Sequence, residues 1–153
     1  MIPDLEVWQR WFLMNKVTPK RFSINKSDRT TYKKLKKLGP FKGQHNSCIF
    51  VVAVALGFFK AKNGIELDDP DQFLHDHNLT ERQKSIIKAV AVHKENNLEV
   101  LANQDKVVKI ANEYANAGLP LIESMVNEHD PDFITSLEDK MVDYFDTEKM
   151  GKI

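Results

Sequence analysis

One cluster in the sequence has the residue types of a metal site. His75, Asp76 and His77 follow three aspartates at positions 68, 69 and 71, and imidazole together with carboxylate suits Zn²⁺ or Mn²⁺. The spacing does not favour this chemistry, because side chains at i and i+2 of a helix point to different faces. Helix capping and the helix dipole already explain the aspartates. We therefore predict no metal site.

The single cysteine could support thiol chemistry only if a base lay beside it. His45 stands three residues before Cys48, near an expected helix start, where the helix dipole lowers a thiol pKa. Cys48 also opens an apolar run that extends to Leu56, which favours a small buried cysteine beside a solvent-facing histidine. The sequence contains no Gly-rich phosphate loop, no Gly-x-Ser-x-Gly, no His-Glu-x-x-His and no paired Cys-x-x-Cys. We expect neither an enzyme nor a cofactor.

The compartment is predicted from the same cysteine and from the apolar runs. One cysteine cannot form an internal disulfide, which indicates a reducing environment. The first residues are acidic where a secretion signal is basic. The longest apolar run is shorter than the ~18–20 residues that a bilayer requires. We expect a cytoplasmic protein with no membrane contact.

Charge is divided very unevenly along the chain, although the formal net charge is zero. Residues 1–60 carry twelve Lys or Arg against three Asp or Glu, whereas residues 61–153 carry ten against nineteen. Such a separation can steer a polyanion towards one part of the molecule. It can equally let the basic segment pack beside the acidic one, and the sequence leaves both interpretations open.

The segment 20–59 has the element order of a ribbon-helix-helix module: a short alternating strand, a capped basic helix, a Gly-containing turn and an apolar helix. In that module the paired strands of a dimer enter the DNA major groove. Base contacts are then expected from Arg21, Ser23 and Asn25. Phosphate contacts are expected from the cations that follow, namely Lys26, Arg29, Lys33, Lys34, Lys36, Lys37 and Lys42. The alternative is a solvated basic helix face that binds no nucleic acid.

The elements that carry these residues are predicted to form a mainly α single domain of about six to seven helices with a short N-terminal edge strand. Periodicity predicts an aromatic helix over 1–16, a helical core over 20–126 and an acidic helix over 130–147 that could be an arm. Within the core we expect helices from Ser27 to about Leu38 and over 44–59, the latter central to the core or to a dimer interface. Capping signals at Asp69-Pro70-Asp71-Gln72 and at Thr80-Glu81-Arg82-Gln83 predict further helices over 69–77 and 80–96. Apolar periodicity predicts two more, one over 105–117 that stops at Gly118 and one over 120–127.

Several packing and turn patterns resemble one protein family. They are the turn 38–42, the end of the apolar helix at 53–58, the segment 65–67, and the later runs at 86–91, 98–101 and 110–116. Across roughly residues 26–122 the chain resembles small accessory proteins encoded beside DNA phosphorothioation (Dnd) modification and restriction genes. The first and last helices lie outside this similarity. The resemblance implies a cytoplasmic role in DNA modification or antiviral defence, beside larger partner proteins. It does not imply that this chain performs sulfur transfer or DNA cleavage.

Three functions are consistent with these patterns. The first is a non-enzymatic accessory factor of a DNA modification–restriction system that contacts double-stranded DNA through residues 20–42, larger defence-system proteins, or both. The second is a protein-interaction or assembly module that binds no DNA, and a homodimer through the apolar helix is one form that it could take. The third is a ribbon-helix-helix-like transcriptional regulator.

Overall fold

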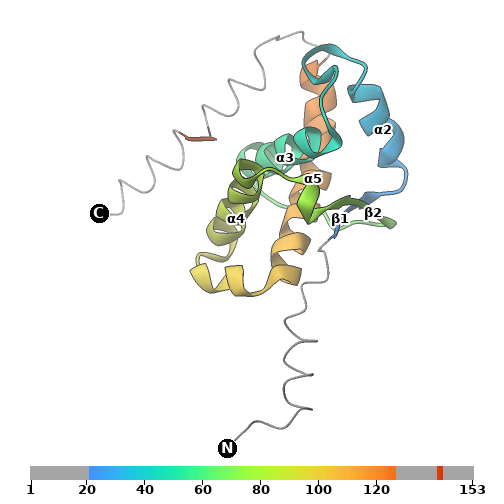
Figure 1. Ribbon diagram of the computed structural model, residues 1–153. Coiled ribbons are helices and arrows are strands. Elements are labelled where there is room, and N and C mark those ends of the chain that lie inside the picture. The colour runs from blue at the N-terminus through green and yellow to red at the C-terminus, as the bar shows by residue number, and fades with distance from the viewer. Residues whose placement is uncertain (1–20, 127–140, 143–153) are drawn as a thin grey trace, which may run out of the picture.

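The computed structural model describes residues 21–126 and 141–142, and these are mainly helical with one small sheet (Figure 1). The α-helices are α2 (Asp28–Leu35), α3 (Asn46–Leu56), α4 (Glu81–Glu95) and α5 (Gln104–Val126), and the strands are β1 (Arg21–Asn25) and β2 (Pro70–His75). The mainly helical class is thereby confirmed. The four α-helices of the described residues are fewer than the six to seven expected. The predicted helix over 1–16, and that over 130–147 apart from residues 141–142, lie outside the described residues.

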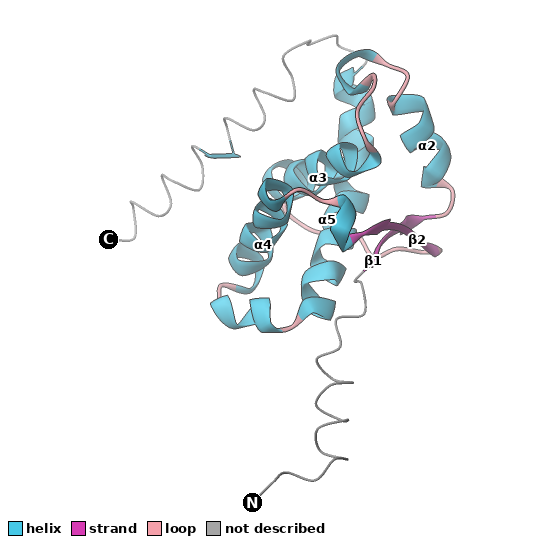
Figure 2. Ribbon diagram, viewed as in Figure 1, coloured by secondary structure: helices cyan, strands magenta, loops and turns pink. Residues whose placement is uncertain are grey.

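The core is built around the contact of α3 with α5, and α3 lies across the middle of the molecule (Figures 1 and 2). Every residue of α3 from Ile49 to Leu56 is buried, which explains why the helix is apolar on all sides. The prediction of a central core helix is confirmed. Because its own chain covers α3, this helix presents no free apolar face for a dimer interface.

Glycines let the two helices approach until their backbones touch. A Cβ atom added at Gly118 of α5 would lie 1.8 Å from the Ala53 carbonyl oxygen, and one added at Gly57 would lie 2.1 Å from the Tyr114 carbonyl oxygen. No real Cβ atom fits at such distances. Gly118 therefore does not end a helix, as the sequence had suggested, but sits at the closest point of the crossing.

The two helices predicted over 105–117 and 120–127 are one helix, α5, which contains Pro120. Proline in a helix interior removes the hydrogen bond to the carbonyl four residues earlier. Leu119 and Ile122 are nonetheless buried in the core on either side of it. Packing against α3 thus holds α5 continuous where local signals predicted a break.

The predicted edge strand exists as β1, with Phe22 and Ile24 buried, but its partner was not predicted. β1 pairs antiparallel with β2, and the register shifts between Phe22 and Ser23. The sequence predicted a helix over 69–77, because an Asp-Pro-Asp-Gln run mimics a helix start. Pairing with β1 and burial of Leu74 in the core outweigh that local signal.

Other boundaries are set by caps. Thr80 and Gln83 form the predicted capping box of α4, with the Gln83 N–H donating to Thr80 Oγ1 at 3.1 Å and the Thr80 N–H to Gln83 Oε1 at 2.9 Å. α2 ends at Leu35, three residues earlier than expected, and α3 passes into a π-helical turn over Gly57–Ala61. None of the helices in the described ranges is long and apolar enough to cross a bilayer.

Candidate nucleic-acid interface

The orientation of α2 separates its apolar residues from its lysines. Tyr32 and Leu35 are buried against the core, while Lys33 and Lys34 are exposed. At 100° per residue these two lysines must point away when Tyr32 points inward. The predicted basic face of this helix is therefore directed to solvent.

The basic face continues past the end of α2 into a short turn. A 3-10 helix over Gly39–Phe41 is anchored by the fully buried Phe41, and Gly39 adopts a φ of 39°. The turn displays further lysines on either side of this anchor. We define the lysine surface as Lys33, Lys34, Lys36, Lys37 and Lys42, of which Lys36 is half-buried and the others are exposed.

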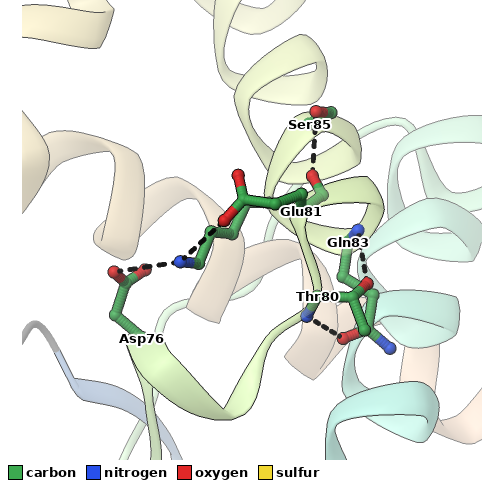
Figure 3. A network of polar contacts seen from close by, with 6 residues as sticks. Asp76, Thr80, Glu81, Gln83 and Ser85 are labelled. Carbon is green, nitrogen blue, oxygen red and sulfur yellow. Dashed lines mark hydrogen bonds and ion pairs between the residues drawn. The ribbon is translucent and has the colours of Figure 1, made fainter.

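No residue of the lysine surface makes an ion pair with any side chain in the described parts of the chain. Two lysines elsewhere differ. Figure 3 shows Asp76 and Glu81 flanking one ammonium group, that of Lys84, at 3.7 and 3.5 Å. Lys106 likewise lies 3.1 Å from Glu95. Within the described residues, the lysine surface therefore carries positive charge that no carboxylate neutralises.

Both predicted arginines contact β2, although both remain exposed. Arg29 pairs with the Asp71 carboxylate and donates to the Gln72 carbonyl oxygen at 2.7 Å, with its guanidinium 5.4 Å from the centre of the Phe73 ring. Arg21 donates to the Gln72 side chain at 2.9 Å. No sequence pattern pointed to the Arg29–Asp71 pair, because the two residues are brought together only by the unpredicted strand β2.

The residues expected to face DNA bases are also engaged within the chain. The Ser23 N–H donates to Asn112 Oδ1 on α5 at 3.0 Å. The Asn25 amide donates to Asn116 Oδ1 at 3.3 Å and accepts from the Asp69 N–H at 3.0 Å. The strand–helix–helix order is as predicted, but β1 is enclosed between β2 and α5. It does not offer the free edge that a dimeric DNA-reading ribbon needs.

Lys26 and Asp28 mark the start of α2. Lys26 is exposed, and its N–H donates to the Asp69 carbonyl oxygen at 3.0 Å. Burial raises the pKa of Asp28, and the neighbouring charge of Glu123 raises it further. The exposed lysines Lys33 and Lys34 lie in the last turn of α2, at the opposite end of the helix from Asp28.

The histidine cluster and the cysteine lie on separate elements, His75 at the end of β2 and Cys48 in α3. The His75 and His77 rings stack with centroids 4.8 Å apart, and desolvation, followed by the charges of Arg21 and His77, lowers the pKa of His75. No group of three or more metal-ligating side chains occurs within the described residues. Cys48 is half-buried, and His45 is exposed at the N-cap of α3.

A hollow lies between α4 and the start of α5. Its lining includes the apolar residues Phe22, Ile87 and Val107 and the polar residues Lys84 and Gln104. The volume is about 20 Å³, which is room for about one water molecule. A hollow of this size does not accommodate an organic substrate.

Comparison with known proteins places the chain in a family. None of the curated proteins and none of the solved structures matches it. A protein family described as DNA sulphur modification system-associated protein 4 matches residues 21–149. The resemblance seen in the sequence is confirmed, and it reaches beyond residue 122 to include the segment 130–147, which had been placed outside it. The chain belongs to this family of proteins associated with DNA sulphur modification systems.

Proposed function

We propose that this protein is a non-enzymatic accessory factor of its DNA sulphur modification system and that it holds double-stranded DNA through the lysine surface. The observation that carries the proposal is the set of five neighbouring lysines without an ion pair in the described residues, on a chain whose family is tied to DNA modification. Larger proteins of the same system are the partners beside which it acts.

The chemistry of the surface suits phosphate groups. The described segment 21–42 holds eight Lys or Arg and one Asp, and lysine ammonium groups bind the DNA backbone as point charges. Lys33 and Lys34 also lie in the last turn of α2, where the helix dipole favours cations. This arrangement keeps the charges in place at little cost to folding.

The contact is with the backbone and not with base edges. The Asn25 side chain, which was expected to reach a base, bonds to Asn116 of α5, and the Ser23 backbone N–H bonds to Asn112 of the same helix. Phosphate contacts position a protein on DNA without reading its sequence. We therefore favour sequence-independent binding over the role of an operator-specific regulator.

The test is fluorescence anisotropy with a duplex of arbitrary sequence at two or more salt concentrations. The full chain should bind at low salt and weaken steeply as salt rises. Replacing Lys33, Lys34 and Lys37 by Ala should make the slope of log affinity against log salt concentration less steep, by the amount that corresponds to about three lost phosphate contacts. Replacing the same three by Glu should abolish binding.

A matched control carries the same three charge changes elsewhere. Lys88, Lys94 and Lys109 are exposed on α4 and α5, and their replacement by Glu should leave most of the affinity if the lysine surface is the site. Equal losses in both variants would show that only net charge matters. Absence of binding by the full chain at low salt would refute DNA contact.

The rival is an assembly module that binds partner proteins without DNA. Leu98 favours it, because its side chain is 72% exposed. The other exposed large apolar residues of the described chain, Leu38, Ile65 and Val142, lie far apart along the chain, and singly exposed apolar residues are ordinary. Co-purification with a larger protein of the system that is lost on Leu98→Asp, with DNA binding absent, would favour the rival.

A further inference from the structure

Arg29 stands out among the cations of α2 because β2 holds it on three sides. Its Nε contacts the Asp71 carboxylate, its Nη2 donates to the Gln72 carbonyl oxygen, and its guanidinium lies over the Phe73 ring. The Phe73 ring in turn packs edge-on against Tyr32 of α2, with centroids 4.7 Å apart. The guanidinium is thereby fixed between the helix and the strand.

Arg29 lies next to the lysine surface, so its pairing with Asp71 bears on how many cations of α2 can contact DNA. Arg29 precedes Lys33 by four residues, so the two side chains leave α2 on the same side, about one helical turn apart. An arginine at this point would lengthen the lysine surface by one cation. A guanidinium can also bind a phosphate through two hydrogen bonds, which an ammonium cannot.

We propose that Arg29 is a latent phosphate contact and that Asp71 holds it away from DNA. This inference rests on the proposed function of the lysine surface. In the native chain the Asp71 carboxylate binds the Arg29 guanidinium in the way that a DNA phosphate would. Removing the carboxylate charge releases Arg29 to the surface and extends the site towards the start of α2.

The pair is suited to such exchange because it is partly open to solvent. The side chains of Arg29 and Asp71 are 43% and 36% exposed, and exposed ion pairs contribute little to folding stability. Asp71→Asn should therefore remain folded, which thermal unfolding followed by circular dichroism would verify. The amide has nearly the same shape as the carboxylate and removes only its charge.

The experiment compares duplex DNA binding by the native chain, Asp71→Asn, Arg29→Gln and the double variant across a salt series. Asp71→Asn should bind about three- to tenfold more tightly at low salt, and its salt slope should be steeper by about 0.9, the value of one added phosphate contact. Arg29→Gln should change the affinity of the native chain less than about twofold. In the Asp71→Asn background the same change should remove the whole gain.

Asp76→Asn is the matched control, since Asp76 pairs with Lys84 and its replacement changes net charge equally. A gain in this variant as large as that of Asp71→Asn would overturn the inference, and so would an unchanged affinity of Asp71→Asn. In both cases binding by the native chain would leave the proposed function standing. If neither the native chain nor Asp71→Asn binds, the proposed function and this inference both fail.

Discussion

The α3–α5 crossing and the lysine surface differ in how closely their residues are packed. At the crossing, Gly57 and Gly118 leave no space for even one added carbon atom. At the lysine surface, four of the five side chains are exposed, and none touches an acidic group of the described residues. The crossing holds the two core helices together, whereas the lysine surface presents positive charge that no carboxylate of the described residues neutralises.

The difference shows where substitutions should act on stability and where they should act on binding. Close-packed interiors respond to the addition of a single methyl group. Surface substitutions away from caps and networks usually change stability by less than about 0.5 kcal/mol. The comparison fails if changes in the two regions have similar effects on unfolding.

The largest effect is expected for Gly118→Ala. Alanine normally stabilises a helix interior relative to glycine by about 1 kcal/mol, but here its Cβ would overlap the Ala53 carbonyl oxygen. We expect destabilisation of about 3 kcal/mol or more, because α3 and α5 must separate. Urea unfolding followed by circular dichroism measures it.

Ser124→Thr is the control for this change, since it adds a methyl group at an exposed position of the same helix. It should alter stability by less than about 0.5 kcal/mol. If Gly118→Ala proved as harmless as the control, the backbone contact between the helices would not exist as described.

A second, smaller effect is expected for Asn116→Ala. The Asn116 side chain accepts from Asn25 and donates to the carbonyl oxygens of Ile65 and Glu66 at 3.0 and 3.3 Å. It therefore ties β1 and the segment before β2 to α5. We expect a loss of about 1–3 kcal/mol in urea unfolding, because partly buried polar groups lose their partners.

Asn112→Ala removes a single bond, to the Ser23 N–H, and should cost less than Asn116→Ala. An equal or larger loss for Asn112→Ala would mean that the contacts of Asn116 do not hold the strand in place.

The sequence was sufficient to predict elements whose signals are local. The capping box of Thr80 and Gln83 was predicted, and so was the alternating pattern of β1, in which the structure buries Phe22 and Ile24. Elements whose form depends on distant partners were not. The run that begins at Pro70 carries strong helix-start signals, yet it forms a strand because β1 lies beside it.

The candidate site divides in the same way. Exposure of Lys33 and Lys34 follows from helical periodicity alone, since Tyr32 and Leu35 must face the core. The contacts of Asn25 with α5 join residues 91 positions apart, and no local pattern encodes them. Alternation in β1 correctly predicted which side chains turn away from the core, but not that another element would cover them.

A still smaller effect on stability is expected for the lysine surface. Replacing Lys33, Lys34 and Lys37 by Ala should change the free energy of unfolding by less than about 0.5 kcal/mol, because these side chains lack partners in the described residues. DNA binding by the same variant should fall. A loss of stability near that of Gly118→Ala would show that these lysines support the fold and would remove the distinction between the two regions.

Asp28 provides the finest test, because it lies where the basic helix meets α5. Burial and then the charge of Glu123 raise its pKa in the folded state, so the folded protein binds this proton more tightly than the unfolded chain. The ionised carboxylate therefore lowers stability at neutral pH, and this cost disappears as pH falls through the raised pKa towards the ordinary aspartate value of about 3.9. Asp28→Asn should accordingly be more stable than the native chain at pH 7. The difference, measured by urea unfolding, should shrink between pH 7 and pH 4.

Glu123→Gln should reduce the pH dependence that Asp28 causes without removing it, since burial is the larger cause of the raised pKa. A stability difference between Asp28→Asn and the native chain that stayed constant over this range would mean that the carboxylate is not held against α5.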